Sequence, residues 1–325
     1  MPQRFKSQHL PACRAVEQVA LVGAGTIGAG WAVEFLAAGL RVNVTDPNPS
    51  AQAQLQEQVL SALPYRVANS AAAEGLLSRL HFFSRLGDAV QDAVFIQEST
   101  PEVAAIKDRV LAEITESAPT SAVIASSTSS FTPTRLQRHC AAPERLVVGH
   151  PFNPVYLVPL VEVVASSKTA PDITAWAMSF YAWLGKCPLH CRREIQGHIA
   201  NRLQEAMLNE ALRLVSQGIA SADDIDQAIR NGPGRRWAAI GPMLLAHLSA
   251  PVGGMREVLK GKFGWEPPAD LQDVITDDKI NDIHRQCETL TNGLDIKELE
   301  ARRDSLLVEL NAAYRNATTS SHHSD

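Results

Sequence analysis

The chain has 325 residues, of which 45% are hydrophobic and 20% are charged, and its formal net charge is -5. This length suits two domains, the composition is that of an ordinary globular protein, and the lack of a basic run argues against a nucleic-acid partner. The first 18 residues hold no apolar signal core and no segment approaches membrane-spanning length. We therefore expect a cytoplasmic protein without a membrane partner.

A glycine-rich turn near the start of the chain follows a short apolar run. The run over 19–22 predicts a buried parallel strand, and the pattern G-x-G-x-x-G comes next, ahead of a helix predicted over 27–38. In such a turn the glycines allow a tight bend, close approach to a pyrophosphate and close packing of helix on strand. The helix N-terminus offers free N–H groups to phosphates. We predict that a dinucleotide binds at Gly23, Gly25, Thr26, Ile27 and Gly28.

An acidic residue stands where a dinucleotide site needs one. A second strand, predicted over 41–45, ends at Asp46, which lies 18 residues after Gly28. A carboxylate at about this distance accepts hydrogen bonds from ribose hydroxyls and repels a 2′-phosphate. The following Pro47-Asn48-Pro49 supplies no arginine for such a phosphate. A glycine-rich turn alone could be purely structural, but this context favours a cofactor site and NAD over NADP.

Strands and helices alternate along the rest of the first 195 residues. Further helices are predicted over 50–63, 65–78, 101–117 and 172–184, with a short one from Pro133. Further strands are predicted over 80–83, 93–97, 122–125, 145–149 and 157–164. We expect Thr100 to cap the helix that begins at Pro101. The alternation is typical of an α/β fold with a doubly wound parallel sheet, so 1–195 is predicted to be an NAD-binding Rossmann-type domain.

The pattern becomes purely helical after Ile195. A long helix predicted over 197–217 carries apolar residues on two faces, which indicates burial on more than one side. Ser221 is expected to cap the next helix, and Gly232–Trp237 is predicted to be a loop. Helices then follow to residue 316. The sequence thus predicts an all-α domain over 196–316 for substrate binding and homodimer formation, and a disordered tail over 317–325.

The five cysteines are odd in number and scattered, which agrees with a reducing compartment. Cys187-Pro-Leu-His-Cys191 resembles a metal or redox cluster in outline. It lies in a strand-like run, however, and no second ligand pair follows at zinc spacing. We expect no metal.

A histidine is a suitable base for oxidising an alcohol with NAD, because its pKa lies near working pH. His150 follows a predicted strand, where open α/β sheets place their ligands. Glu162 lies on the adjoining segment, and turning back toward His150 would let it fix the imidazole tautomer. The residues alone leave open a capping histidine and a surface glutamate.

Five ordered motifs, spread over almost the whole chain, resemble the 3-hydroxyacyl-CoA dehydrogenase family. They are Val22-Gly-Ala-Gly-Thr-Ile-Gly28, Ser126-Ser-Thr-Ser-Ser130, His150-Pro-Phe-Asn-Pro154, Leu160-Val-Glu-Val163 and Gly197-His-Ile-Ala-Asn-Arg202. The resemblance implies that His150 is the general base and Glu162 its partner. It implies that Ser129 and Asn201 hydrogen-bond the substrate oxygen at the reacting carbon. The residues implied to line the nicotinamide-ribose half of the cofactor site are Glu98, Lys107 and Asn153.

Local roles are the alternative for several of these residues. Ser129 lies in a serine-rich segment, Asn201 in the first turn of a helix, and Lys107 on a helix face that could be solvated. The sequence suggests no partner for four other histidines, which we expect to be structural: His190, His198, His247 and His284.

The segment after the second predicted strand has few basic residues, which matters for the choice of substrate. Acyl-CoA enzymes of the family resemble one another in using a lysine-bearing helical segment there to meet CoA phosphates. This chain has no lysine between Lys6 and Lys107, and Arg66 and Arg79 are the only cations over 50–83 apart from histidine. Such a segment is a poor match for a multiply charged CoA tail.

Other segments resemble a branch that acts on free 3-hydroxy acids. Those over 95–102, 150–157 and 234–237 are similar to enzymes of L-carnitine, and those over 201–204 and 300–303 to enzymes of L-gulonate, which are related to lambda-crystallin. A trimethylammonium group favours aromatic faces, and a carboxylate favours arginine. The aromatic side chains could equally be core or interface residues. The candidates for contacting the substrate are Phe152, Tyr156, Trp237, Arg235 and Arg236.

The expected reaction is therefore NAD-dependent oxidation of an L-3-hydroxy acid to the 3-oxo acid. L-Carnitine is the leading substrate. L-Gulonate, an acyl-CoA or another short 3-hydroxy acid stay as alternatives, and a crystallin-like structural or NAD-sensing protein is the alternative outside the enzymes.

Overall fold

A computed structural model describes residues 10–67 and 70–320. The chain divides into two compact units, Met1–Met207 and Leu208–Asp325. The division falls inside the helix α8 (Ala200–Ser216), further along the chain than the predicted boundary after residue 195.

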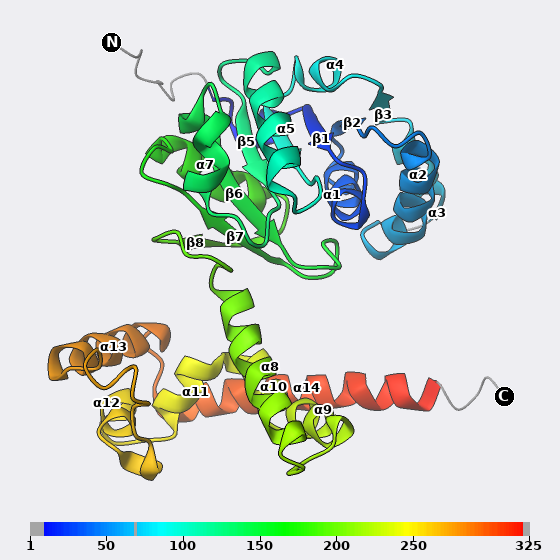
Figure 1. Ribbon diagram of the computed structural model, residues 1–325. Coiled ribbons are helices and arrows are strands. Elements are labelled where there is room, and N and C mark those ends of the chain that lie inside the picture. The colour runs from blue at the N-terminus through cyan, green and yellow to red at the C-terminus, as the bar shows by residue number, and fades with distance from the viewer. Residues whose placement is uncertain (1–9, 68–69, 321–325) are drawn as a thin grey trace. The chain divides into compact units, whose positions relative to one another are not determined.

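The first unit is built on one eight-stranded sheet, and Figure 1 shows its strands surrounded by helices. The strands are β1 Gln18–Val22, β2 Arg41–Thr45, β3 Leu80–Phe83, β4 Phe95–Glu98, β5 Val123–Ser126, β6 Leu146–Pro151, β7 Leu160–Val164 and β8 Cys187–Cys191. Their spatial order is β3-β2-β1-β4-β5-β6-β7-β8, and all neighbours are parallel except β6 and β7. The chain order reverses at β1 and β4, where open α/β sheets bind ligands.

Helices cover both faces of this sheet. They are α1 Thr26–Ala37, α2 Ala51–Ala62, α3 Ser70–Leu77, α4 Leu86–Val90, α5 Ala104–Ser117, α6 Pro133–Leu136 and α7 Pro171–Trp183. Alternate strand residues face opposite sides: Val19 and Leu21 pack in a core with α1, α2 and α7, whereas Ala20 and Val22 pack in a core with α4, α5 and α6. The predicted doubly wound sheet is confirmed.

The pair β6–β7 departs from the parallel pattern. The connection over 152–159 is too short for a crossover helix, so the chain turns back and β7 runs antiparallel to β6. In the resulting register His150 stands directly opposite Glu162.

The start of α5 was predicted wrongly. Thr100 does not cap it, because α5 begins at Ala104 after Val103, which makes no side-chain cap. Instead the amide and the hydroxyl of Thr100 both donate to Glu98 Oε1, at 2.7 and 2.5 Å. The buried Glu98 carboxylate therefore holds Thr100 at the end of β4, four residues before the helix begins.

The second unit is entirely helical, as expected. Its helices, with α8 (Ala200–Ser216) leading into it, are α9 Ala222–Asn231, α10 Pro233–Ile240, α11 Pro242–Leu248, α12 Gly254–Leu259, α13 Asp277–Leu290 and α14 Ile296–Ser320. Ser221 caps α9 through a capping box with Asp224, as predicted. The predicted loop over Gly232–Trp237 is wrong, because α10 starts at Pro233; proline is well accommodated at a first helical position.

The helix α14 continues to Ser320, so the chain is helical over the first part of the predicted tail, and 321–325 lie outside the described residues. No helix in the described part of the chain is long and apolar enough to cross a membrane.

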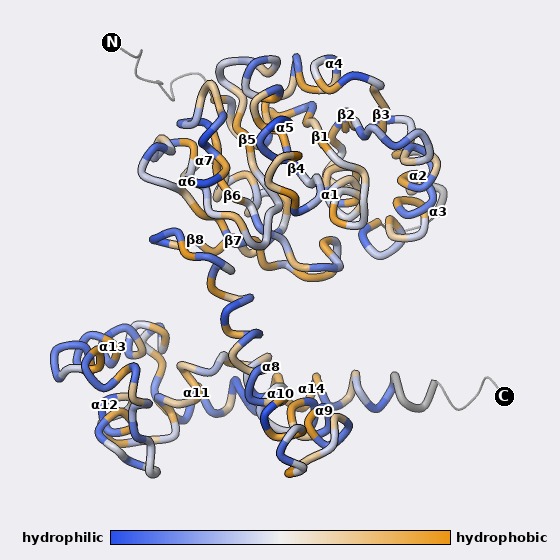
Figure 2. The backbone as a smooth tube through the Cα atoms, viewed as in Figure 1, coloured by the Kyte–Doolittle hydropathy of each residue, from blue (hydrophilic) through white to orange (hydrophobic). Residues whose placement is uncertain are grey.

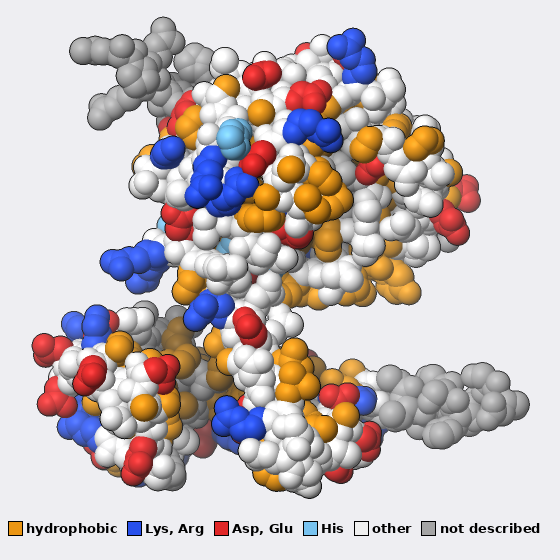
Figure 3. Space-filling view, in the orientation of Figure 1, with side chains coloured by type: hydrophobic (Ala, Val, Ile, Leu, Met, Phe, Trp, Pro, Cys, Tyr) orange, Lys and Arg blue, Asp and Glu red, His pale blue; other side chains and the backbone are white. Residues whose placement is uncertain are grey.

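Several apolar residues of α8 are exposed in the described part of the chain. No residue of α8 is buried, although the sequence predicts burial on two sides. The side chains of Leu203, Leu208 and Leu212 are 64%, 56% and 58% exposed. Hydrophobic segments alternate with hydrophilic ones along this helix in Figure 2, and hydrophobic side chains gather on the surface there in Figure 3.

Candidate active site

The turn after β1 has the geometry of a phosphate cradle. Gly23 has φ of 100°, and a Cβ there would meet the Ser99 carbonyl oxygen at 2.6 Å. A Cβ on Gly28 would meet the Gly23 carbonyl oxygen at 2.1 Å, which ties α1 closely to the turn. Above Gly25, by contrast, a Cβ would meet nothing within 4 Å, so its backbone faces open space at the start of α1. These residues fit a bound pyrophosphate.

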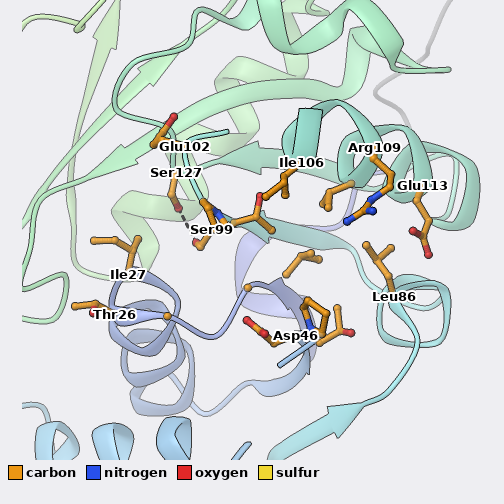
Figure 4. Close-up of a pocket in the computed structure, with 18 of the residues that line it drawn as sticks. Thr26, Ile27, Asp46, Leu86, Ser99, Glu102, Ile106, Arg109, Glu113 and Ser127 are labelled. Carbon is orange, nitrogen blue, oxygen red and sulfur yellow. Dashed lines mark hydrogen bonds between the residues drawn. The ribbon is translucent and has the colours of Figure 1, made fainter. Parts of the chain in front are cut away.

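A cleft of about 820 Å³ opens over this turn. Figure 4 shows Thr26 and Ile27 toward one end of it and Leu86, Arg109 and Glu113 toward the other. Its lining includes most of the predicted cofactor residues, namely Gly23, Gly25, Thr26, Ile27 and Asp46, together with Ser129 and His150. The cleft therefore joins the dinucleotide turn to the candidate catalytic residues.

Backbone amides hold Asp46 in place at the end of β2. Its two carboxylate oxygens accept hydrogen bonds from the amides of Ala24 (2.9 Å) and Asn48 (2.8 Å). Arg85, which the sequence analysis did not single out, is exposed and lines the same cleft. Arg85 could have been found from the strand order. It follows β3, which pairs with β2 in parallel, and the carboxyl ends of parallel neighbours meet at one edge of the sheet.

Glu98 and Lys107 form a buried ion pair beside the cleft. Both side chains are almost fully buried, and Lys107 Nζ lies 2.9 and 3.1 Å from the two Glu98 oxygens. Glu98 also accepts from Thr100 and from the Ser126 hydroxyl. Neither Glu98 nor Lys107 is among the residues that line the cleft. This pair fixes the ends of β4 and β5 and the backbone at Thr100, to which Lys107 Nζ also donates.

One carboxylate organises the serine-rich segment after β5. Glu102 accepts from the Ser129 amide (2.8 Å), the Thr128 hydroxyl (2.9 Å) and the Ser130 hydroxyl (3.1 Å). The Ser129 amide is thereby fixed at the cleft wall. The sequence predicts a helix that begins at Pro101, and a helical Glu102 gave no reason to expect this contact.

His150 and Glu162 are brought together by the β6–β7 register. His150 Nδ1 lies 2.9 Å from Glu162 Oε2, and both side chains are buried. Burial by itself would raise the pKa of Glu162. The hydrogen bond from His150 and those from the Ala200 and Ile199 amides outweigh burial and hold this pKa below its usual range. A carboxylate that stays ionised fixes a proton on Nδ1, which leaves Nε2 as the free nitrogen of a neutral imidazole.

A second buried histidine lies beside this pair. The rings of His198 and His150 are 5.2 Å apart, and His198 Nε2 donates to the Thr128 carbonyl oxygen at 3.1 Å. Burial lowers the pKa of His198, and the hydrogen bond to Thr128 opposes this only in part. His198 therefore links the start of α8 to the serine-rich segment, a long-range contact that nothing in the sequence pattern indicated.

The other residues of the first unit that were predicted to contact the substrate or the cofactor have varied surroundings. Phe152 packs edge-on against His150, with 4.9 Å between ring centroids. Tyr156 stacks at 6.0 Å on Tyr65, which the sequence analysis had not considered. Asn153 is exposed and Asn201 is half-buried in the first turn of α8.

Three candidates lie on α10 in the second unit. The guanidinium of Arg235 donates to the Arg230 carbonyl, to Asn231 and to Asn311, so it is already engaged within this unit. Trp237 is 38% exposed. Arg236 follows Arg235 on the same helix.

No group of three or more His, Cys, Asp or Glu side chains within the described residues is arranged to hold a metal ion. What the site does offer is a glycine-rich turn at a helix N-terminus, a carboxylate at the end of β2 and a paired histidine at one cleft. Fold and site together define the class of an NAD-dependent dehydrogenase.

Comparison with protein families is more specific. The profile of the 3-hydroxyacyl-CoA dehydrogenase NAD binding domain matches residues 18–195, and that of the C-terminal domain matches residues 197–285. The chain belongs to the 3-hydroxyacyl-CoA dehydrogenase family, and it is an NAD-dependent 3-hydroxy dehydrogenase.

Individual relatives cover nearly the whole chain. The L-carnitine dehydrogenase of Bacillus cereus is 42% identical over 301 residues, which cover 91% of this chain and 92% of that protein. That of Streptomyces griseus is 43% identical and covers 91% of this chain and 89% of that protein. Among solved structures, a 3-hydroxyacyl-CoA dehydrogenase from Archaeoglobus fulgidus is 26% identical with a TM-score of 0.68, covering 91% of this chain and 99% of that one.

Proposed function

We propose that this protein oxidises the 3-hydroxyl group of L-carnitine to a 3-oxo group. The observation that carries the proposal is the His150–Glu162 pair, 2.9 Å apart, at a cleft that also holds the dinucleotide turn. The similarity to L-carnitine dehydrogenases over about nine-tenths of the chain supports the choice of substrate.

His150 is the proposed general base. The bound NAD supplies the hydride acceptor. Because Nδ1 is bonded to Glu162, Nε2 of His150 takes the proton from the substrate hydroxyl. The imidazolium that forms lies against a carboxylate whose pKa is held low, which stabilises the charge. Glu162 thus acts on the substrate only through His150.

Ser129 and Asn201 are proposed to hydrogen-bond the substrate oxygen. Ser129 lines the cleft together with His150, and its backbone is fixed by Glu102. Asn201 follows Ala200, whose amide donates to Glu162. Ser129 therefore shares the lining of the cleft with the base, and Asn201 directly follows a residue that contacts the partner of the base.

The cofactor is proposed to bind on the turn and along the cleft. The turn residues Gly23, Gly25, Thr26, Ile27 and Gly28 would receive the pyrophosphate, and Asp46 would accept from the adenosine ribose. For Glu98 and Lys107 we propose an indirect role, since they fix the backbone beside the cleft without lining it. Asn153 stays a candidate for the nicotinamide half.

The substrate's two charged ends need different partners. Phe152 packs edge-on against His150, so an aromatic ring lies beside the base, and a trimethylammonium group gains about 0.5–2 kcal/mol on the face of each such ring. Tyr156 and Trp237 are the further aromatic candidates. Of the two arginines on α10, Arg236 is the better candidate for the carboxylate, because the guanidinium of Arg235 is engaged by Asn231 and Asn311.

The two arginines near the second strand are already engaged in internal contacts, which disfavours a CoA substrate. Arg66 Nε lies 3.0 Å from the buried Glu34, and Arg79 Nη1 donates to the Gly39 carbonyl at 2.8 Å. These are the only lysine or arginine residues over 50–83. Releasing either to bind a phosphate would break an internal contact, and in the case of Arg66 would leave a buried carboxylate with one cation fewer.

The test is NAD reduction at 340 nm with L-carnitine, L-gulonate and 3-hydroxybutyryl-CoA, each over a wide concentration range. We expect kcat/KM to be highest for L-carnitine. Phe152→Leu should raise the KM for L-carnitine severalfold while leaving NAD affinity unchanged. A higher kcat/KM for the CoA ester would contradict the proposal, and would show that phosphate binding comes from another part of the chain.

We further propose a homodimer formed through the helical domain over 196–316. The exposed apolar side chains of α8 support it, since Leu203, Met207, Leu208 and Leu212 are 43–64% exposed. Sedimentation should give twice the mass of the chain, and Leu208→Asp should shift it toward the monomer. A cytoplasmic location is also proposed, supported by five cysteines that are all unpaired.

A further inference from the structure

Two serine hydroxyls face each other on the wall of the cleft. Ser99 follows β4 and Ser127 follows β5, and their Oγ atoms are 2.8 Å apart. Figure 4 shows this contact beside the turn that carries Ile27. Both residues line the cleft, and each backbone amide is fixed, that of Ser99 to the Val22 carbonyl and that of Ser127 to the Glu98 carbonyl, both at 2.7 Å.

The direction of the Ser99–Ser127 hydrogen bond follows from the other partners of Ser127. The indole nitrogen of Trp31 lies 3.2 Å from Ser127 Oγ and can only donate. The side-chain amide nitrogen of Gln97 donates to the same oxygen at 2.8 Å. A hydroxyl oxygen has two lone pairs, so these two donors occupy both. The Ser127 proton must therefore be given to Ser99 Oγ.

The orientation of the Gln97 amide is itself determined. Its nitrogen also faces the Gly149 carbonyl oxygen at 3.4 Å, and a flipped amide would set two oxygens against each other there. Its oxygen accepts from the buried Tyr181 hydroxyl at 2.7 Å. The chain of donors from Tyr181 through Gln97 to Ser127 is thus fixed in one direction.

At the end of this chain stands Ser99. Its oxygen accepts from Ser127, and within the described residues it has no second hydrogen-bond partner. The proton of the Ser99 hydroxyl is therefore available for donation. Because Ser99 is half-buried on the wall of the cleft, its acceptor is either water or an atom of a ligand bound in the cleft.

The position of Ser99 indicates which part of NAD supplies that acceptor. Its carbonyl lies where a Cβ on Gly23 would fall, so Ser99 is packed against the dinucleotide turn. Its hydroxyl contacts Ser127, two residues before Ser129, and Ser129 lines the cleft with His150. Ser99 thus lies between the pyrophosphate end and the site of hydride transfer, which is the place of the nicotinamide riboside.

We propose that Ser99 is a pre-oriented hydrogen-bond donor to an oxygen of the nicotinamide riboside half of NAD. Ser127, Gln97 and Tyr181 hold its proton in that direction. A hydroxyl that is already oriented loses little freedom on binding, so its single hydrogen bond contributes to affinity at low entropic cost.

The test is calorimetric titration of the whole protein with NAD, ADP-ribose and ADP, without any hydroxy-acid substrate. Ser99→Ala should weaken NAD binding about three- to tenfold, the range for one neutral hydrogen bond. Ser99→Cys, which keeps the volume but is a poor donor, should weaken it similarly. Ser179→Ala, on the exposed side of α7, is the matched control and should bind NAD as the unmodified chain does.

The three ligands separate the possible acceptors. A loss for NAD and ADP-ribose places the contact on the ribose, and a loss for NAD alone places it on the nicotinamide carboxamide. ADP carries the pyrophosphate but not the second ribose, so its affinity should not change in either case. Normal NAD binding by Ser99→Cys, or an equal loss for ADP, would overturn the proposal. The proposal rests on the NAD site and on the position of His150, so a substrate other than L-carnitine would not affect it.

Discussion

Two buried glutamates stand near the same edge of the sheet, and their partners differ. Glu98, at the end of β4, is bonded to Lys107 Nζ and to donors from Thr100 and Ser126. Glu162, on β7, is bonded to His150 and to two backbone amides from the start of α8. Both side chains are fully buried, and both are well supplied with donors.

The partner decides what each carboxylate can do. The Glu98–Lys107 pair does not line the cleft and joins β4, β5 and α5, so it is a structural contact. Histidine gains and loses a proton near neutral pH, so the Glu162–His150 pair can move one. The same residue type in a similar environment therefore serves as an anchor in one place and supports proton transfer in the other.

The largest expected effect comes from breaking the fixed pair. Lys107→Met should lower the free energy of unfolding by about 3–5 kcal/mol, because it leaves Glu98 buried without a cation. Urea unfolding measures this. The double variant Glu98→Gln/Lys107→Met is the control and should recover most of the loss. A loss below about 1 kcal/mol in the single variant would mean that Glu98 is less isolated than its burial indicates.

Breaking the titratable pair should affect catalysis more than stability. His150→Ala should lower kcat at least about a hundredfold while NAD still binds, because the base is removed and the dinucleotide turn is intact. Stopped-flow or steady-state assays with L-carnitine, together with NAD titration, measure both quantities. His190→Ala, an exposed histidine on β8, is the control. Undiminished activity in His150→Ala would refute the assignment of the base.

The smallest effect concerns pH. The pKa of Glu162 is held below its unfolded value, so the stabilisation it brings is complete above about pH 4.3 and is lost as pH falls through the folded pKa. Unfolding free energies between about pH 3 and pH 6 should therefore fall more steeply in the unmodified protein than in Glu162→Gln. An equal pH dependence of the unfolding free energy in the two proteins would show that Glu162 does not contribute to the loss of stability in acid.

Short-range patterns predicted much of this structure well. The strand–turn–helix over the first glycines, the continuous burial of the strand that precedes them and the capping of α9 by Ser221 all depend on neighbours within a few residues. The same reasoning failed at Thr100, which binds Glu98 instead of capping α5, and at Pro233, which begins α10 instead of a loop. In both cases a local pattern was compatible with two outcomes.

The amino-acid sequence by itself determined the fold class and the dinucleotide turn, because hydrophobic periodicity and glycine spacing are local physical constraints. It pointed to His150 as the candidate base only through its resemblance to the family. Only the tertiary structure decided how the site is assembled. The short β6–β7 connection sets His150 opposite Glu162, Glu102 reaches across to hold Ser129, and His198 bonds Thr128, seventy residues earlier in the chain. Such contacts arise when separate elements pack into one core, and their energies depend on burial that no local pattern records.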